Sequence, residues 1–481
     1  MKVTKLKQVL NDSVMTQQEY NKEIEAIYCK FPSFQVVGSK AFKPGLDSMR
    51  RIASYFDNPQ DKYKTIHIAG TNGKGSTSSM IASALMSKYK KVGLYTSPHL
   101  VDFRERIKIN GKMVPQEYVY DFLVNNKELF LSERASFFEI TTALAFKYFA
   151  DEKIDCAVIE CGLGGRLDST NIITPQLSII TNIGLDHCQF LGHTLAEIAS
   201  EKAGIIKAGV PVVLGESAEK DVYETITEKA VEAGSPYYVA DRIFGGLSNK
   251  DSLQTDCTKI YELSREIYSA VDFNKMDLPG SYQKKNVKTV ATALSVLINN
   301  SLLNMMQDSA ALQSQKSKAQ QLSELAHTIE QTAQRTVLRG RWEKLVPKTS
   351  KDILVICDTG HNAHGFATLK EQIERTHALR GGKLIMLFGV VADKDLEAIS
   401  HLLPDKALYI PVQAKGERAL PSAALREKLV SFGLECTQNF SSVEDGLSYA
   451  LEIADNKDFI YIGGSTFVVA EALTSDFLNK K

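Results

Sequence analysis

A glycine-rich segment carries the strongest chemical signal in this amino-acid sequence. It reads Gly70-Thr-Asn-Gly-Lys-Gly-Ser76, follows the strand-like run Ile66–Ala69 and precedes a stretch of helical period. Glycines let a backbone wrap closely around phosphate oxygens, and N–H groups at the start of a helix point at a bound anion. Lys74 adds a mobile positive charge. A strand, this turn and a helix in succession predict a phosphate-binding loop.

The loop differs from the common P-loop at a position that bears on metal binding. Gly75 follows Lys74, where the usual hydroxyl ligand for Mg²⁺ would stand. Mg²⁺ prefers oxygen ligands, and the ligands of open α/β sheets collect at the carboxyl ends of the strands. Three segments follow such strands, and they contain Ser97, Glu160 and the pair Asp186-His187.

Glu160 also has an ordinary structural interpretation. A carboxylate that ends a buried strand can cap a helix or join an ion pair, because an unpaired buried charge is costly. The glycine-rich turn Gly162–Gly165 that follows Glu160 can approach a ligand closely and favours a functional position. His187, judged alone, is equally compatible with either interpretation.

Six segments together resemble the folylpolyglutamate synthase/dihydrofolate synthase family, which belongs to the Mur-ligase superfamily. The resemblance runs in order from about Thr16 to the C-terminus. The segments are Ala69-Gly-Thr-Asn-Gly-Lys-Gly-Ser76, Thr96-Ser-Pro-His-Leu100, Glu160-Cys-Gly-Leu-Gly-Gly-Arg-Leu-Asp-Ser-Thr-Asn171, Leu185-Asp-His187, Glu201-Lys-Ala-Gly-Ile205 and Asp358-Thr-Gly-His-Asn362.

The resemblance implies an ATP site with two Mg²⁺ ions. It places Ser97 and Glu160 at one ion and His187 at the second. Lys202 matches a lysine that is carbamylated in the family; a carbamate offers negative oxygens to a metal, whereas a bare ammonium would be repelled. Without the resemblance, Lys202 is interpreted as a lysine on an exposed helix face. The implied ATP contacts are Thr71, Asn72, Gly73, Lys74, Gly75 and Ser76 in the loop, and Asn286, Arg341 and Asp358 farther along the chain.

The resemblance also implies catalytic and substrate-binding positions. Catalytic roles fall to Lys74, His187, Lys202 and His361. His361 and Ser465 match positions implicated in the ligation step or in glutamate binding. The positions that resemble a dihydropteroate pocket are Lys43-Pro44-Gly45, Ser136-Phe137-Phe138-Glu139 and Leu167-Asp168-Ser169. The chain departs from the family pattern at Lys43-Pro44, where Asp-Leu is usual, at Arg339-Gly340-Arg341, where Pro-Gly-Arg is usual, and at Thr359-Gly360, where Gly-Ala is common.

The implied reaction is an ATP-dependent amide ligation through an acyl phosphate. L-Glutamate would be added to dihydropteroate, to reduced folylpolyglutamates, or to both. We expect the bifunctional enzyme, and an enzyme that only extends folates is the alternative. A muramyl-peptide ligase would carry a nucleotide-sugar domain before the loop, and 69 residues precede Gly70. A non-catalytic nucleotide switch would need neither a second metal nor a carbamate.

Short β-rich runs alternate with helical patterns from residue 64 onward, which indicates an α/β protein. We expect an N-terminal P-loop domain with a mostly parallel sheet over residues 1–346, with residues 1–14 as a possible extension, and a smaller Rossmann-like C-terminal domain over residues 347–481. Residues 237–276 look like a small antiparallel strand set, and residues 299–336 like a solvated helical pair. The expected strands are Thr65–Ala69, Val92–Thr96, Cys156–Glu160, Ser178–Asn182 and Val210–Leu214, then Ile353–Cys357, Lys383–Phe388, Ala407–Pro411 and Asp458–Ile462.

Composition excludes several classes of partner. The 481 residues contain 57 Lys plus Arg and 57 Asp plus Glu, so no basic excess is available for nucleic acid. No uncharged apolar run approaches the roughly 20 residues that span a bilayer. The seven cysteines are scattered and form no Cys-x-x-Cys pair, which predicts reduced thiols in the cytoplasm. We expect a monomer, since no apolar helix stands out as a partner surface.

Overall fold

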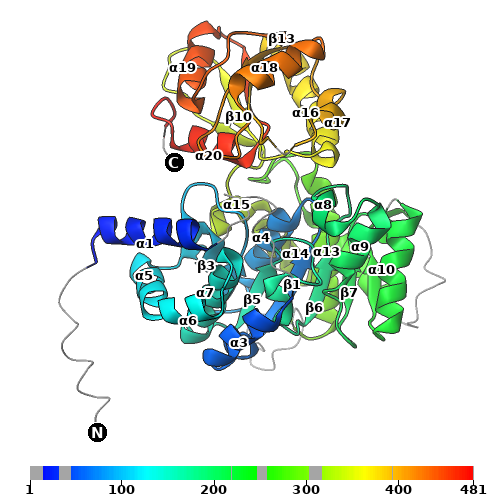
Figure 1. Cartoon of the computed structure of the whole chain (residues 1–481). Coiled ribbons are helices and arrows are strands. Elements are labelled where there is room, and N and C mark those ends of the chain that lie inside the picture. The colour runs from blue at the N-terminus through cyan, green and yellow to red at the C-terminus, as the bar shows by residue number, and fades with distance from the viewer. Residues whose placement is uncertain are drawn as a thin grey trace.

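The computed structural model describes residues 15–31, 45–217, 219–245, 257–302, 317–392 and 394–479. Lys43, Pro44 and the possible extension over residues 1–14 lie outside these ranges. Two lobes are stacked one above the other, each built around its own sheet (Figure 1). This arrangement confirms the predicted α/β class with two parallel-rich sheets.

The N-terminal lobe contains an eight-stranded sheet in the order β4-β3-β2-β5-β1-β6-β7-β8. Six neighbouring strands run parallel: β2, β5, β1, β6, β7 and β8. The strands β3 and β4, at one edge of the sheet, pair antiparallel. The strands are β1 (Lys64–Ala69), β2 (Val92–Tyr95), β3 (Ile107–Ile109), β4 (Lys112–Met113), β5 (Cys156–Glu160), β6 (Leu177–Ile180), β7 (Val212–Leu214) and β8 (Tyr237–Val239).

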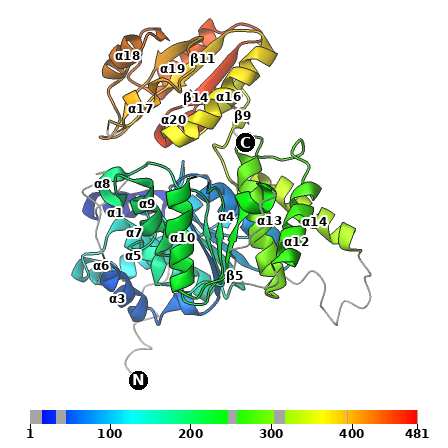
Figure 2. The ribbon, with the colours of Figure 1, turned by 90° about the vertical axis from the view of Figure 1, so that its right-hand side faces the viewer.

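Helices cover both faces of this sheet because its strands are apolar on both sides. Ile66 and Ile68 of β1 pack on one face with the helices α4, α12, α13 and α14, while Ile159 and Ile180 pack on the other. Figure 2 shows these two helical layers on either side of the sheet. The helices are α1 (Gln17–Lys30), α3 (Asp47–Tyr55), α4 (Lys74–Leu85), α5 (Gln116–Asn125), α6 (Lys127–Ser132), α7 (Phe137–Asp151), α8 (Cys188–Leu191), α9 (Leu195–Ala203), α10 (Lys220–Glu232), α11 (Ala240–Gly245), α12 (Thr258–Ala270), α13 (Gln283–Asn299), α14 (Lys318–Glu330) and α15 (Thr332–Thr336).

The C-terminal lobe contains a six-stranded sheet in the order β13-β12-β11-β14-β10-β9. Only the edge strand β9 is antiparallel among the described strands of this sheet. The expected division at residue 347 stays a prediction, although β9 lies before it and already pairs with β10. The elements are β9 (Glu343–Leu345), β10 (Leu354–Cys357), β11 (Leu384–Phe388), β12 (Ala407–Pro411), β13 (Glu435–Cys436), β14 (Phe459–Gly463), α16 (Ala363–Arg380), α17 (Leu396–Ser400), α18 (Ser422–Ser431), α19 (Val443–Ile453) and α20 (Thr466–Thr474).

Two expectations about the connecting segments are wrong. In the described parts of residues 237–276, which are 237–245 and 257–276, the chain forms the parallel strand β8 and then α11 and α12, not an antiparallel strand set. In place of a solvated helical pair, α14 and α15 pack against α4, and Leu325, Ile329 and Thr336 are buried. The buried stripe of α14 and α15 combines the apolar Leu325 and Ile329 with the polar Thr328, Thr332 and Thr336. Because polar residues also face the core, the average polarity of the segment concealed this stripe.

Cys156, Cys161, Cys188, Cys257, Cys357 and Cys436 are all free. Among the described helices, none is long and apolar enough to cross a membrane.

Candidate active site

Two adjoining cavities occupy the crevice between the lobes, where the carboxyl ends of both sheets lie. The first, which we call the loop cavity, has a volume of about 200 Å³ and is lined by residues 71–76 and by the start of α16. The second, the phenylalanine cavity, has a volume of about 300 Å³ and contains Phe137, Phe138 and Phe467. Both cavities are lined by Thr71, Lys74, Ser97, Pro98, His361 and Thr466, which therefore form their common wall.

The loop between β1 and α4 requires glycine at two positions. A Cβ atom on Gly70 would lie 1.9 Å from Thr181 Oγ1, and one on Gly73 would lie 2.4 Å from Asn286 Oδ1. Gly73 also has a φ of 77° and begins α4 as its N-cap. The backbone N–H groups at the start of α4 therefore line the loop cavity, as the sequence predicts for an anion site.

Lys74 is folded back onto its own loop. Its Nζ donates to the carbonyl oxygens of Gly70 at 3.0 Å and Thr71 at 3.1 Å. The ammonium stands at the common wall of the two cavities, where it can neutralise an anion held on either side.

Glu160 and Ser97 meet at the loop cavity as the sequence predicts. Glu160 is 2% exposed, and its Oε2 accepts a hydrogen bond of 3.2 Å from the Ser97 backbone N–H. Burial raises the pKa of Glu160 to about 7 against the opposing effect of Lys74. A buried carboxylate and a hydroxyl are oxygen donors that fit Mg²⁺. Among the described residues, no group of three or more His, Cys, Asp or Glu side chains that could hold a metal ion is found.

Lys202 is buried, which corrects its interpretation as a surface lysine. Only 3% of the residue is exposed, and its Nζ donates to the Gly70 carbonyl at 2.9 Å. Burial, with help from the nearby Lys74 ammonium, lowers the pKa of Lys202 to about 7. His187, the N-cap of α8, lines the same phenylalanine cavity, and burial lowers its pKa to about 4, so the ring is neutral and able to ligate a metal.

Asn286, Arg341 and Asp358 gather at the far wall of the loop cavity. Asp358 Oδ2 accepts from the Tyr282 hydroxyl at 2.6 Å and from the Trp342 N–H at 2.7 Å. Burial raises the pKa of Asp358 although Arg341 acts in the opposite direction. The structure therefore brings together all the predicted ATP positions around one cavity.

The expected pterin positions divide into cavity-lining residues and structural ones. Ser136, Phe137, Phe138, Leu167, Asp168 and Ser169 line the phenylalanine cavity. Ser465, expected at the ligation step or in glutamate binding, lines the same cavity. Glu139 lines neither cavity; its carboxylate accepts from the Ser136 N–H at 2.7 Å and caps α7. Gly45 also lies outside both cavities.

The Asp168 carboxylate is hydrogen-bonded to groups of the protein itself. Its carboxylate accepts from the N–H groups of Gly162, Leu163 and Thr170 and from the Thr170 hydroxyl, at 2.5 to 3.0 Å. These four donors fill its acceptor sites, so Asp168 fixes the shape of the glycine-rich turn after β5.

The phenylalanine cavity is rich in positive charge. Its lining includes Lys74, Arg106, Lys202, Lys394 and Arg418 against the carboxylates of Asp168 and Asp186. Such a cavity favours an anionic ligand. Arg106 and Lys394 were not predicted at this site. Arg106 lies in no recognisable motif, and Lys394 lies in residues 389–395, whose pattern is that of a strand-to-helix turn.

The chain is similar to known proteins over most of its length. Residues 68–294 match the Mur ligase middle domain, and residues 340–466 match the Mur ligase glutamate ligase domain. The chain is 31% identical over 379 residues to the dihydrofolate synthase/folylpolyglutamate synthase of Bacillus subtilis, covering 75% of this chain and 80% of the relative. It is 31% identical over 453 residues to the Haemophilus influenzae protein of the same name, covering 89% and 93%. A solved bifunctional folylpolyglutamate synthase/dihydrofolate synthase with Mn, AMPPNP and L-glutamate bound has a TM-score of 0.68 and 25% identity, covering 90% of this chain and 94% of that one.

Proposed function

Since this chain belongs to the Mur ligase family, we propose that it is an ATP-dependent ligase that adds L-glutamate to dihydropteroate and to reduced folates. The observation that carries the proposal is the common wall of the two cavities. A nucleotide in the loop cavity and a carboxylate in the phenylalanine cavity would meet at Lys74, Ser97 and His361.

The loop cavity would hold the triphosphate and the phenylalanine cavity the acceptor. The flat rings of Phe137 and Phe138 suit a pterin, and the surrounding cations suit the carboxylate end of the acceptor and the incoming glutamate. The acceptor carboxylate attacks the γ-phosphate and releases ADP, and the glutamate amine then attacks the acyl phosphate and expels phosphate. Lys74 and the loop N–H groups stabilise the negative charge on the phosphoryl group in transfer.

Divalent metal binding fits the donors at this site. Ser97 and Glu160 would hold one Mg²⁺, and His187 with a carbamylated Lys202 would hold a second. When bound, these ions neutralise phosphate charge. The surroundings of Lys202 support the modification, because a pKa of about 7 leaves much of the amine neutral and nucleophilic toward CO₂. The products are the lysine carbamate and a proton.

A coupled assay tests the function directly. Phosphate release from ATP is expected only when glutamate is present together with dihydropteroate or a reduced folate. Hydrolysis at the same rate without an acceptor would contradict the proposal and favour a nucleotide switch. Comparison of dihydropteroate with tetrahydrofolate as the acceptor separates the bifunctional enzyme from one that only extends folates.

The remaining expectations concern the whole protein. We propose a division into an ATP-binding domain over residues 1–346 and a ligase domain over residues 347–481. The free thiols support a reducing, cytoplasmic location. A monomer is proposed because no apolar helix stands out in the sequence as a partner surface.

A further inference from the structure

Two asparagines from different lobes form a reciprocal pair of hydrogen bonds. Asn72 lies in the phosphate-binding loop, and Asn362 lies at the start of α16. Asn72 Nδ2 donates to Asn362 Oδ1 at 3.1 Å, and Asn362 Nδ2 donates back to Asn72 Oδ1 at 3.0 Å. The side chain of Asn72, which the sequence assigned to ATP, is therefore directed at the other lobe.

Every hydrogen-bonding site of the Asn362 side-chain amide has a partner. Its Oδ1 also accepts from the Gly365 N–H at 2.9 Å, which caps α16, and its Nδ2 donates to Asp186 Oδ2 at 2.9 Å. With Asn72, these partners satisfy both amide hydrogens and both oxygen lone pairs. Asn362 is 5% exposed, so a missing partner could not readily be replaced by water.

Two further contacts extend the connection between the lobes. Asn72 Nδ2 also lies 3.0 Å from His364 Nδ1, and Lys394 Nζ lies 3.0 Å from Asp186 Oδ1. We refer to these residues, Asn72, Asp186, Asn362, His364 and Lys394, as the interlobe bridge.

The interlobe bridge lies between the two cavities. Asn72 and His364 line the loop cavity, whereas Asp186 and Lys394 line the phenylalanine cavity. Asn362 lines neither, and it adjoins His361, which lines both. The bridge thus joins the lobes at the place where an activated carboxylate would form.

We propose that Asn362 is a positioning residue that ties the phosphate-binding loop to the C-terminal lobe through Asn72, fixes His361 at the common wall and shields the acyl phosphate from water. This proposal rests on the ligase function proposed above. A loosened bridge lets the lobes separate and admits water to the reacting carbonyl, so ATP is consumed without amide formation.

The decisive variant is Asn362→Asp. Aspartate keeps the acceptor oxygen that caps α16, but it cannot donate to Asn72 and it sets a second carboxylate beside Asp186. The matched control is Asp395→Asn, the reverse exchange at the N-cap of α17, whose Oδ1 accepts from the Ala398 N–H at 3.1 Å. Asn362→Ser is a second variant, which retains a capping oxygen and removes the amide.

Two measurements decide the proposal. Small-angle scattering with AMPPNP should give a larger radius of gyration for Asn362→Asp and Asn362→Ser than for wild type and Asp395→Asn. In both Asn362 variants, the ratio of phosphate released to amide formed should rise well above one. The kcat of these variants should fall about 10- to 100-fold relative to wild type, with a smaller change in KM for ATP. Asn72→Asp should add little to Asn362→Asp, since both break the same pair.

The outcomes separate this proposal from the ligase function. Equal radii of gyration for wild type and both Asn362 variants would overturn the proposal, and so would an unchanged phosphate-to-amide ratio in an active enzyme. Wild-type protein that forms no amide would refute the ligase function, and the scattering comparison would still decide whether Asn362 holds the lobes together.

Discussion

Glu160 is a carboxylate whose burial makes its charge expensive unless a cation is close. Its pKa of about 7 lies above the ordinary value of 4.5. A carboxyl with a raised pKa contributes stability that is fully present below pH 4.5 and is lost as the pH rises through 7. The ligand-free protein should therefore lose stability toward alkaline pH at this residue.

We expect Glu160→Gln to abolish this pH dependence. In EDTA, the free energy of unfolding of wild type should fall by ~3 kcal/mol relative to the variant between pH 4.5 and 8. Urea unfolding at a series of pH values measures the difference. Mg²⁺ at pH 8 should recover part of the loss in wild type only. Parallel pH curves for the two proteins would refute the explanation.

Lys202→Ala should lose ligase activity, because the carbamate proposed above cannot form in this variant. High bicarbonate should not restore turnover, whereas short carboxylic acids should restore part of it by supplying the missing oxygens. Steady-state assays with and without acetate measure this effect. Turnover equal to that of wild type would remove Lys202 from the mechanism.

A series of buried hydrogen bonds links Asp168 to His67 through Thr170. Since the Asp168 carboxylate only accepts, the Thr170 hydroxyl donates to it at 2.5 Å, and the Thr170 oxygen accepts from His67 Nε2 at 2.8 Å. Burial lowers the pKa of His67 to about 3, which keeps the ring neutral. His67, in the middle of β1, thus reaches the phenylalanine cavity through two hydrogen bonds.

Thr170→Val should disturb this chain without changing side-chain volume. The unfolding free energy should fall by about 1–3 kcal/mol, since His67 and Asp168 each lose a partner. KM for dihydropteroate should rise by about tenfold while KM for ATP stays near its wild-type value. Thr170→Ser, which keeps the hydroxyl, is the control, and an equal loss in both variants would contradict the role of the hydroxyl.

At the scale of elements, the strands were predictable because their apolar runs are short and contiguous, and because turn-forming residues bound them. All nine expected strands exist; two have the expected bounds, and no end of the other seven is shifted by more than two residues. The two-residue strands β4 and β13 carry too few residues for a pattern. In the misinterpreted 237–276 segment, β8 is only three residues long and α11 follows it directly, so the strand period is too short to be recognised.

The site was predictable where a motif follows a strand and unpredictable where tertiary packing decides. Glu160 and Asp358 end strands and meet as expected at one cavity. The burial of Lys202 depends on how α9 packs beside β1, which its own helix does not reveal. The bond between Asn72 and Asn362 joins residues 290 positions apart, so no local pattern announces it.

The C-terminus of α15 stores backbone strain just before the chain enters the C-terminal lobe. Val337 adopts a φ of 53°, in the left-handed region that β-branched residues avoid. Lys108 of β3 secures the turn, since its Nζ donates to the carbonyls of Thr336 at 2.9 Å and Val337 at 3.2 Å.

Val337→Asn should relieve this strain. Asparagine tolerates the left-handed region, and the backbone bonds to Lys108 are unaffected, so the unfolding free energy should rise by about 1 kcal/mol. Chemical denaturation measures the change. Val337→Ala retains the strain and should remain within ~0.5 kcal/mol of wild type; an equal gain in both variants would show that strain is not the cause.

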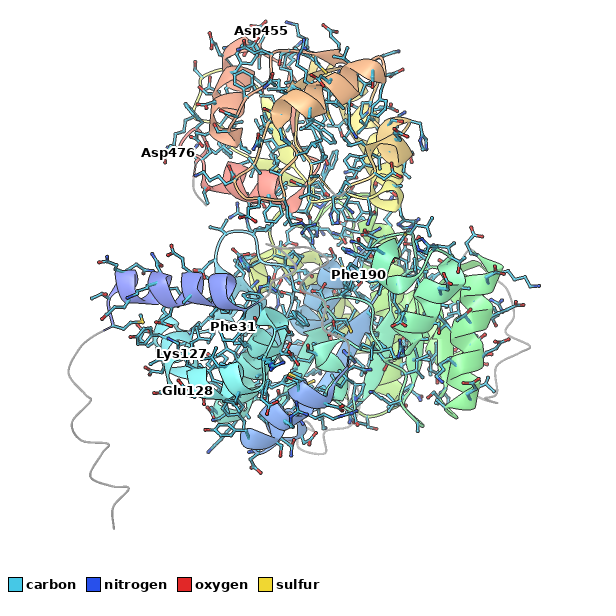
Figure 3. The ribbon with its side chains drawn as sticks, in the orientation of Figure 1. Phe31, Lys127, Glu128, Phe190, Asp455 and Asp476 are labelled. Carbon is cyan, nitrogen blue, oxygen red and sulfur yellow. The ribbon has the colours of Figure 1, made fainter. Side chains whose placement is uncertain are left out.

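At the scale of the whole molecule, the two lobes have separate apolar cores. Tyr282 of the N-terminal lobe packs against the C-terminal core, while the other contacts described between the lobes are mainly polar. Figure 3 shows side chains from both lobes in the space between them, with Phe190 on the N-terminal side. A polar interface of this kind couples the unfolding of one lobe only weakly to the unfolding of the other.

Calorimetry should therefore resolve two unfolding transitions in the ligand-free protein. AMPPNP with Mg²⁺ contacts both lobes in the proposed complex, so it should raise both transitions and bring them closer together. A single transition without ligand, with equal calorimetric and van't Hoff enthalpies, would show that the lobes unfold as one unit.

The two kinds of contact in the interlobe bridge respond differently to ionic strength. Asp186 and Lys394 carry formal charges, and their side chains are 12% and 20% exposed, so dissolved salt weakens their attraction. The paired amides of Asn72 and Asn362 have no net charge to screen. In concentrated electrolyte the lobes would stay joined through these amides, while the field that draws anions into the crevice fades.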